Sequence, residues 1–177
     1  MRDVGPAHVA RTEGGDWTEG NWTLGEGYAV GPEAGPRVVV LDYGVKANIL
    51  RLLTGAGARV AVLPGKASFD EIKALNPDGV VVSNGPGDPA ETGKYALTTI
   101  KALLDAKIPT LGICLGHQML ALAIGAKTAK MPQGHHGANH PVKNHETGQV
   151  EIVSMNHGFA VDGSTLPANA EETHVSL

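Results

Sequence analysis

The chain has 177 residues, of which 42% are hydrophobic and 18% are charged, and its formal net charge at pH 7 is −4. This length and composition are typical of one globular domain with a sizeable core. The slightly acidic balance gives no basic footprint for nucleic acid, and no apolar run approaches the ~18 residues that a membrane-spanning helix needs. Cys114 is the single cysteine and allows no internal disulfide, so we expect a reducing compartment, the cytoplasm.

Residues 1–36 differ from the rest of the chain. They carry glycine and charge but little apolar periodicity, and they end in Gly31-Pro32-Glu33-Ala34-Gly35-Pro36, which is typical of a linker. We therefore predict a connector over residues 1–36 and one domain over residues 37–177.

From residue 37 onward, runs of β-branched residues alternate with helix-like stretches. The predicted strands are 37–41, 59–63, 79–82 and 109–113, and the predicted helices are 45–53, 68–75, 91–106 and 115–124. This alternation predicts an α/β fold with an open, mostly parallel sheet and flanking helices. After residue 126 come short extended segments separated by turns, which predict a small antiparallel extension. These segments are 127–131, 141–143, 150–155 and 173–177.

The pentapeptide Gly112-Ile113-Cys114-Leu115-Gly116 joins a predicted strand to a predicted helix. A sharp turn at this point needs small residues two before and two after its central residue, so the pattern is that of a nucleophile elbow with cysteine in place of serine. The helix that follows points its amino terminus at the sulfur, which favours the reactive thiolate. We therefore predict that Cys114 is the nucleophile of an acyl-transfer enzyme that works through a thioester. The alternative is that this lone cysteine is a small buried hydrophobe.

Two further features belong to the same predicted sheet edge. The loop Ser83-Asn84-Gly85-Pro86-Gly87-Asp88-Pro89 follows the third predicted strand, and carboxyl ends of parallel strands meet at one edge. Its glycines let backbone N–H groups approach a developing oxyanion, although a plain proline–glycine turn has the same composition. Gln118 lies four residues after Cys114, one helical turn along, and is either a pocket residue or a solvated one.

Histidines gather in the last third of the chain. Gly134-His135-His136-Gly137-Ala138-Asn139-His140 invites a zinc interpretation, but no second cysteine or pair of carboxylates completes a ligand set. We predict no metal here and instead a polar turn that shapes a pocket or an interface. Asn156-His157-Gly158-Phe159 follows a strand-like run. His157 is the in-chain candidate for a general base, or else a loop histidine that orders backbone or contacts substrate.

These motifs resemble those of class I glutamine amidotransferase domains. Residues 112–118 are similar to the family's nucleophile motif, and residues 83–89 to its oxyanion loop. The resemblance covers essentially residues 37–177. Further segments resemble the small, glutamine-hydrolysing chain of carbamoyl-phosphate synthase in particular, and residues 12–30 look like the segment that joins its two domains. Those further segments are 42–49, 134–143, 156–162 and 166–169.

The resemblance implies a mechanism. Cys114 would attack the side-chain amide of L-glutamine, release ammonia and leave a glutamyl thioester, which water would hydrolyse to glutamate. The backbone N–H groups of Gly87 and Leu115 would stabilise the oxyanion. The positions that match glutamine-holding residues of the family are Gly85, Gly87, Leu115, Gln118, Asn156, Gly158 and Phe159.

The resemblance also implies a partner. Ammonia would pass through a tunnel to the carbamoyl-phosphate synthase large chain, which uses ATP, magnesium and bicarbonate to make carbamoyl phosphate for arginine and pyrimidine biosynthesis. The ligase activity would need that large chain, and the present chain would need no cofactor of its own.

One family motif is missing from the sequence. The family's catalytic base and its orienting carboxylate come from a His-Pro-Glu motif, which does not occur in residues 1–177. The motif would lie beyond Leu177, and the family's amino-terminal domain is missing as well. We therefore expect a piece that is truncated at both ends and nearly inactive alone. Two alternatives remain: a non-catalytic docking or regulatory module of the synthase large chain, and a different thiol enzyme that uses His157 as its base.

Overall fold

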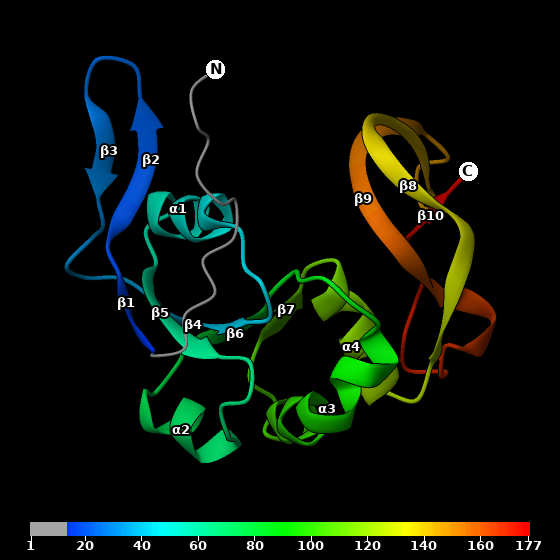
Figure 1. Cartoon of the computed structure of the whole chain (residues 1–177), viewed down its shortest axis with the longest axis horizontal. Coiled ribbons are helices and arrows are strands. Elements are labelled where there is room, and N and C mark those ends of the chain that lie inside the picture. The colour runs from blue at the N-terminus through cyan, green and yellow to red at the C-terminus, as the bar shows by residue number, and fades with distance from the viewer. Residues whose placement is uncertain (1–13) are drawn as a thin grey trace.

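The computed structural model describes residues 14–177 and contains a central sheet in the order β1-β5-β4-β6-β7. Its strands are β1 (Gly15–Trp17), β4 (Arg37–Asp42), β5 (Arg59–Pro64), β6 (Gly79–Val82) and β7 (Thr110–Gly112). β4 to β7 pair in parallel, whereas β1 joins the edge of β5 in antiparallel register (Figure 1). The predicted α/β fold with an open, mostly parallel sheet is therefore confirmed.

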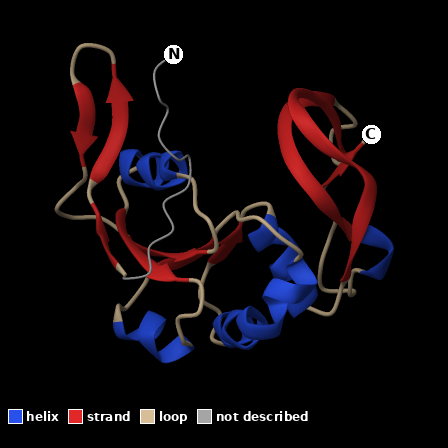
Figure 2. Cartoon of the chain, in the orientation of Figure 1, coloured by secondary structure: helices blue, strands red, loops and turns tan. Residues whose placement is uncertain are grey.

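Helices cover both faces of this sheet (Figure 2). They are α1 (Ala47–Gly55), α2 (Phe69–Ala74), α3 (Pro89–Asp105) and α4 (Leu115–Ala123). Successive residues of β4 point to opposite faces, so Val40 packs with Leu50 of α1, while Val39 packs with Ile72 of α2 and Leu103 of α3. Burial on both faces explains why the strands read as continuous apolar runs. Within residues 14–177, no helix is long and apolar enough to cross a membrane.

The start of α2 follows the sequence closely. The Ser68 hydroxyl accepts a hydrogen bond from the Glu71 backbone N–H at 3.3 Å, and the Glu71 carboxylate accepts one from the Ser68 backbone N–H at 2.7 Å. This reciprocal pair is the predicted capping box, an arrangement that stabilises a helix by about 1 kcal/mol.

The described part of the connector is attached to the domain. Besides β1, it contains a hairpin of β2 (Glu19–Thr23) and β3 (Gly27–Val30). Arg51 of α1 forms an ion pair with Glu19 at 2.7 Å and places its guanidinium carbon 4.1 Å from the centre of the Tyr28 ring. Residues 14–36 are thus held against α1 and extend the sheet, while the boundary at residue 36 stays a prediction and residues 1–13 lie outside the described residues.

The antiparallel extension consists of longer strands than the sequence suggests. β8 (Lys127–Asn144) and β9 (Val150–Asp162) form a hairpin, and β10 (His174–Ser176) pairs with β8. The predicted turn at 134–140 is wrong because this stretch lies within β8. The same prediction also expected the segment to shape a pocket or an interface, and His135 and His136 do line a cleft. Residues 156–159 lie within β9 rather than in a loop. The two strands pair along most of their length, with register shifts between Lys130 and His135 and between Gly137 and His140. Cross-strand hydrogen bonds therefore hold segments whose composition has little strand preference.

Candidate active site

Cys114 occupies a strained turn between β7 and α4. It is the N-cap of α4, with φ 53° and ψ −106°. Among residues 14–177, only Asn76, Lys107 and Cys114 are non-glycine residues with a positive φ. Such a conformation typically costs about 1–3 kcal/mol and persists only where the surroundings enforce it. The strand–turn–helix geometry is that of a nucleophile elbow, and the catalytic role of the cysteine stays a prediction.

The two glycines of the pentapeptide are required by close backbone contacts. A Cβ on Gly112 would lie 2.6 Å from the carbonyl group of Gly116, so the turn cannot close over a larger residue. A Cβ on Gly116 would overlap the carbonyl oxygen of Val82 at the end of β6. The first turn of α4 therefore packs directly on the sheet backbone, and this packing holds the cysteine at the sheet edge.

The loop after β6 is fixed at both ends beside the cysteine. At its start, the Ser83 hydroxyl accepts a hydrogen bond from the Tyr43 backbone N–H at 3.0 Å. At its end, the Asp88 carboxylate caps α3 by accepting from the Ala90 N–H at 2.8 Å. Gly87, between these anchors, has φ 104°, a conformation that residues other than glycine rarely adopt. This loop thus has a fixed backbone that can present N–H groups.

Gln118 connects α4 to β9. Its side chain is 6% exposed, and its Nε2 donates a hydrogen bond to the carbonyl oxygen of Phe159 at 2.6 Å. The His157 Nδ1 lies 2.8 Å from the same oxygen. The sequence left open whether Gln118 is a solvated residue, and its burial excludes that interpretation.

One cleft brings most of the predicted site residues together. It has a volume of ≈ 1570 Å³ and lies between the sheet edge, α4 and the β8–β9–β10 sheet. Leu115 does not line it, because its side chain is 2% exposed and packs in the core, so it can act only through its backbone. The predicted site residues that line the cleft are Cys114, Gly85, Gly87, Gln118, Asn156, Gly158 and Phe159.

The sulfur contacts β9 through a backbone carbonyl. Cys114 Sγ lies 3.8 Å from the carbonyl oxygen of Asn156, within reach of a weak S–H hydrogen bond. The His157 ring, in contrast, contacts the Phe159 carbonyl through Nδ1 and the Met155 sulfur through Nε2, the latter at 3.4 Å. Both ring nitrogens of His157 thus have partners other than the cysteine, which argues against this histidine as the base.

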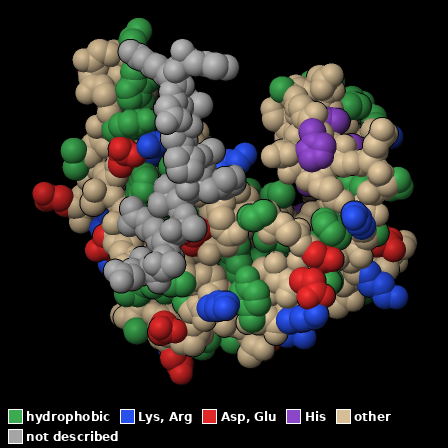
Figure 3. Space-filling view, in the orientation of Figure 1, with side chains coloured by type: hydrophobic (Ala, Val, Ile, Leu, Met, Phe, Trp, Pro, Cys, Tyr) green, Lys and Arg blue, Asp and Glu red, His purple; other side chains and the backbone are tan. Residues whose placement is uncertain are grey.

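Three histidines of the β8–β9 hairpin form a cluster of rings, and Figure 3 shows histidine side chains at the surface of this part of the molecule. The His135 and His140 rings stack with centroids 4.8 Å apart, and the His157 ring meets His135 edge-on at 5.2 Å. Partial burial lowers the pKa of His135, and the imidazoles of His140, His157 and His136 lower it further. Within the described part of the chain, no group of three or more His, Cys, Asp or Glu residues could hold a metal ion.

Further polar side chains also line the cleft, and two of them, Lys46 and His136, were not among the predicted glutamine-binding residues. Lys46 precedes α1, and its backbone N–H donates to Asn84 Oδ1 at 3.2 Å. His136 lies opposite Asn156 across the hairpin. The sequence drew attention to His136 only as part of the histidine-rich segment 134–140, and the register of β8 against β9 is what reveals its pairing with Asn156.

Replacing Gln118 with glutamate is expected to weaken the site, because a carboxylate cannot donate to the Phe159 carbonyl. We expect a loss of about 2–3 kcal/mol in the free energy of unfolding, together with roughly a tenfold rise in KM for the substrate. Thermal unfolding and steady-state kinetics would measure both effects. Gln133→Glu, the same change at an exposed position of β8, is the matched control. Equal behaviour of the two variants would contradict a role for the Gln118–Phe159 hydrogen bond.

Comparison with known proteins adds family information. Residues 39–177 match the family model described as glutamine amidotransferase class-I. The chain is 95% identical over 171 residues to the carbamoyl phosphate synthase small chain of Maricaulis maris, a match covering 97% of this chain and 44% of that relative. It is 65% identical over 161 residues to the small chain of Brucella anthropi, a match covering 91% of this chain and 40% of that relative. The chain therefore spans less than half the length of these curated relatives.

Solved structures with the same fold are more distant in sequence. A GMP synthase protein of Thermoplasma acidophilum superimposes with a TM-score of 0.69 at 23% identity, covering 82% of this chain and 75% of that chain. A glutamine amidotransferase of Thermotoga maritima superimposes with a TM-score of 0.60 at 23% identity, covering 80% of this chain and 67% of that chain. At these identities, the likeness shows a shared fold.

Proposed function

Because the chain belongs to the class-I glutamine amidotransferase family, we propose that it carries the nucleophile for glutamine hydrolysis in the small chain of a carbamoyl-phosphate synthase. The observation that carries this proposal is the strained elbow of Cys114, which shares one cleft with the glycine-containing loop after β6. The 95% identity to the small chain of Maricaulis maris supports the narrower assignment to this synthase.

The first half of the proposed reaction breaks the amide bond. The Cys114 thiolate attacks the side-chain carbonyl carbon of glutamine, and the carbonyl oxygen takes up the negative charge of the tetrahedral intermediate. The backbone N–H groups of Gly87 and Leu115 donate to this oxygen, and each such donor typically contributes about 3 kcal/mol to transition-state stabilisation. The carbon–nitrogen bond then breaks, the nitrogen leaves as ammonia after taking up a proton, and a glutamyl thioester remains.

The second half returns the free thiol. Water adds to the thioester carbonyl, the carbon–sulfur bond breaks, and glutamate leaves. Both halves need a histidine that moves protons next to the sulfur. Because the His157 ring nitrogens contact other groups, we propose that this base comes from the part of the relatives' length that the present chain does not span.

The proposed small chain works with a large one. We propose that ammonia passes to a carbamoyl-phosphate synthase large chain, which supplies the ATP- and magnesium-dependent ligase chemistry in the cytoplasm and feeds arginine and pyrimidine biosynthesis. The present chain holds no cofactor in this scheme. Its own contribution is the nucleophile, the oxyanion donors and the cleft that holds glutamine.

Glutamate release from glutamine tests the proposal. We expect hydrolysis by the complete protein that contains these residues, and at least about 10³-fold less by residues 1–177 alone, because removal of a triad member typically costs that much. Circular dichroism of residues 1–177 would show that an inactive chain is folded, and Cys114→Ser in the complete protein sets the background. Comparable turnover by residues 1–177 would mean that an in-chain residue, with His157 first, serves as the base.

A further inference from the structure

The Asn156 residue of β9 links the nucleophile to a histidine on β8. Its backbone carbonyl oxygen lies 3.8 Å from Cys114 Sγ. Its side-chain Oδ1 lies 2.7 Å from the Nδ1 of His136. With the carboxamide oxygen facing the ring, His136 must carry a proton on Nδ1 and donate it. One residue therefore touches the sulfur through its backbone and the imidazole through its side chain.

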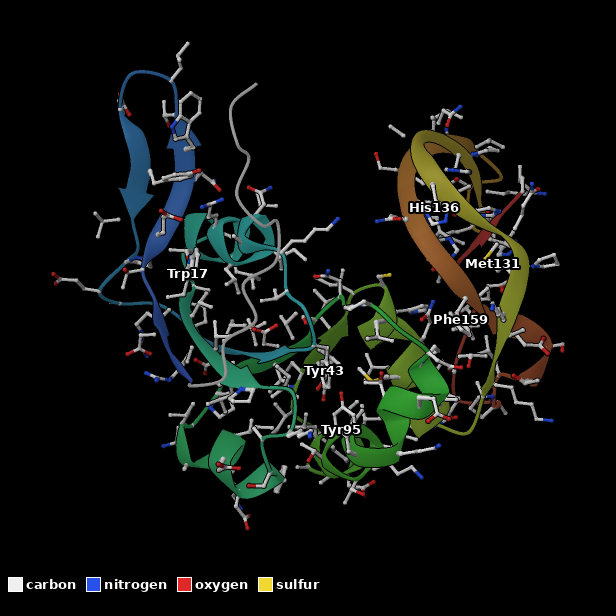
Figure 4. All side chains as sticks on the ribbon, viewed as in Figure 1. Trp17, Tyr43, Tyr95, Met131, His136 and Phe159 are labelled. Carbon is white, nitrogen blue, oxygen red and sulfur yellow. The ribbon has the colours of Figure 1, made fainter. Side chains whose placement is uncertain are left out.

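The hairpin register fixes this pair. His136 lies directly opposite Asn156, and the neighbouring pair is His135 opposite His157. Because successive side chains of a strand point to opposite faces, the first pair occupies one face and the second pair the other. The His136–Asn156 contact thus lies on the opposite face of the hairpin from the His135–His157 pair, although the His136 imidazole still lowers the pKa of His135. Figure 4 labels His136 on the β8–β9 hairpin.

The absence of a side chain at Gly134 leaves room for the His136 ring. A Cβ on Gly134 would lie 2.5 Å from the His136 Nε2 and 2.9 Å from the carbonyl oxygen of His157. Any larger residue at this position would push the ring away. The imidazole thus contacts the Asn156 carboxamide through Nδ1 and has its Nε2 in the space that a side chain at Gly134 would occupy, and both His136 and Asn156 are exposed to the cleft.

We propose that His136 is a positioning residue for glutamine hydrolysis: its Nδ1–H holds the Asn156 side chain and thereby fixes the Asn156 backbone beside Cys114. This inference rests on the proposed function. His136 does not touch the reacting atoms and acts only through Asn156. The hydrogen bond sets where β9 meets the nucleophile, so it shapes the space in which glutamine lies next to the sulfur.

Kinetics on the complete protein separate this role from a purely structural one. His136→Phe keeps a ring and removes the donor, whereas His136→Asn keeps an N–H donor near the position of Nδ1. We expect the first variant to raise KM for glutamine about tenfold with kcat changed less than about twofold, and the second to restore most of the loss. His145→Phe, which removes another exposed histidine of the hairpin region that pairs with Glu172, should leave KM unchanged.

A double-mutant cycle with Asn156→Ala tests whether His136 acts through Asn156. If it does, the double variant has no higher KM than the Asn156→Ala variant alone. The proposal would be overturned if the two substitutions raised KM by factors that multiply in the double variant. An unchanged KM in His136→Phe would overturn it as well. If His136→Phe does not fold, Gly134→Ala displaces the ring instead and should raise KM in the same way, and an unchanged KM there would equally overturn it.

A second measurement tests the role of His136 without relying on glutamine hydrolysis. The rate at which iodoacetamide alkylates Cys114, followed by mass spectrometry of its peptide, reports the surroundings of the sulfur without any glutamine. We expect His136→Phe and Asn156→Ala to speed alkylation by similar factors, with no further gain in the double variant. If the wild-type protein does not hydrolyse glutamine but the two substitutions show this coupling in the alkylation rate, the proposed function is refuted. The effect of His136, through Asn156, on the surroundings of Cys114 is then still supported. Unchanged alkylation in both variants would refute the positioning role.

Discussion

Replacing Cys114 with serine in the complete protein is expected to lower glutamine-dependent turnover by about 10⁴-fold or more. The thiol lies at the amino terminus of α4, in a turn where Cys114 has a strained backbone conformation with positive φ. A serine hydroxyl fits the same turn but ionises far less readily than a thiol, so it is a poor nucleophile in a site built for sulfur. Steady-state measurement of glutamate release gives the effect directly.

Free ammonia supplies the control for this variant. Carbamoyl phosphate formation from added ammonium chloride bypasses glutamine, so we expect Cys114→Ser to leave it unchanged in the complex with the large chain. Loss of both activities would indicate a damaged fold rather than a missing nucleophile. If Cys114→Ala left glutamine-dependent synthesis unchanged, the chain would act as a docking or regulatory module instead of a catalyst.

The second large effect is expected from Gly116→Ala. The added methyl group would overlap the carbonyl oxygen of Val82, and neither the strand nor the first turn of α4 can yield without losing core contacts. We expect a loss of about 3 kcal/mol in the free energy of unfolding. Any protein that still folds should lose most of its glutaminase activity, because α4 carries the cysteine. Thermal and denaturant unfolding of the complete protein measure the stability.

Gly79→Ala is a matched control for the crowding argument. Gly79 begins β6, the strand that ends at Val82, and the nearest atom to its added Cβ would be the Pro109 carbonyl oxygen at 3.4 Å, an ordinary contact. We expect this variant to unfold within about 0.5 kcal/mol of the wild type. Equal stability of the Gly116 and Gly79 variants would show that α4 does not rest on the β6 backbone as described.

Patterns in the sequence predicted the elbow at Cys114 and the loop after β6, because residues close in sequence determine both. The glycines around Cys114 indicated a sharp turn because the steric demand of such a turn falls on residues close in sequence. The loop after β6 was predictable for a similar reason, since carboxyl ends of parallel strands share one edge. The burial of Gln118 was not predictable, because it depends on the approach of Phe159 from β9, 41 residues further along the chain.

The sequence by itself determined the α/β fold and the position of the elbow, because β-branched runs, helical periodicity and paired glycines are local consequences of backbone sterics. Only the tertiary structure decided what faces the sulfur. Residues 134–140 and 156–159 are polar and rich in glycine, so they carry no apolar alternation that could fix a strand or its register. Pairing between distant segments supplies that register, places His136 opposite Asn156, and brings the Asn156 carbonyl to Cys114.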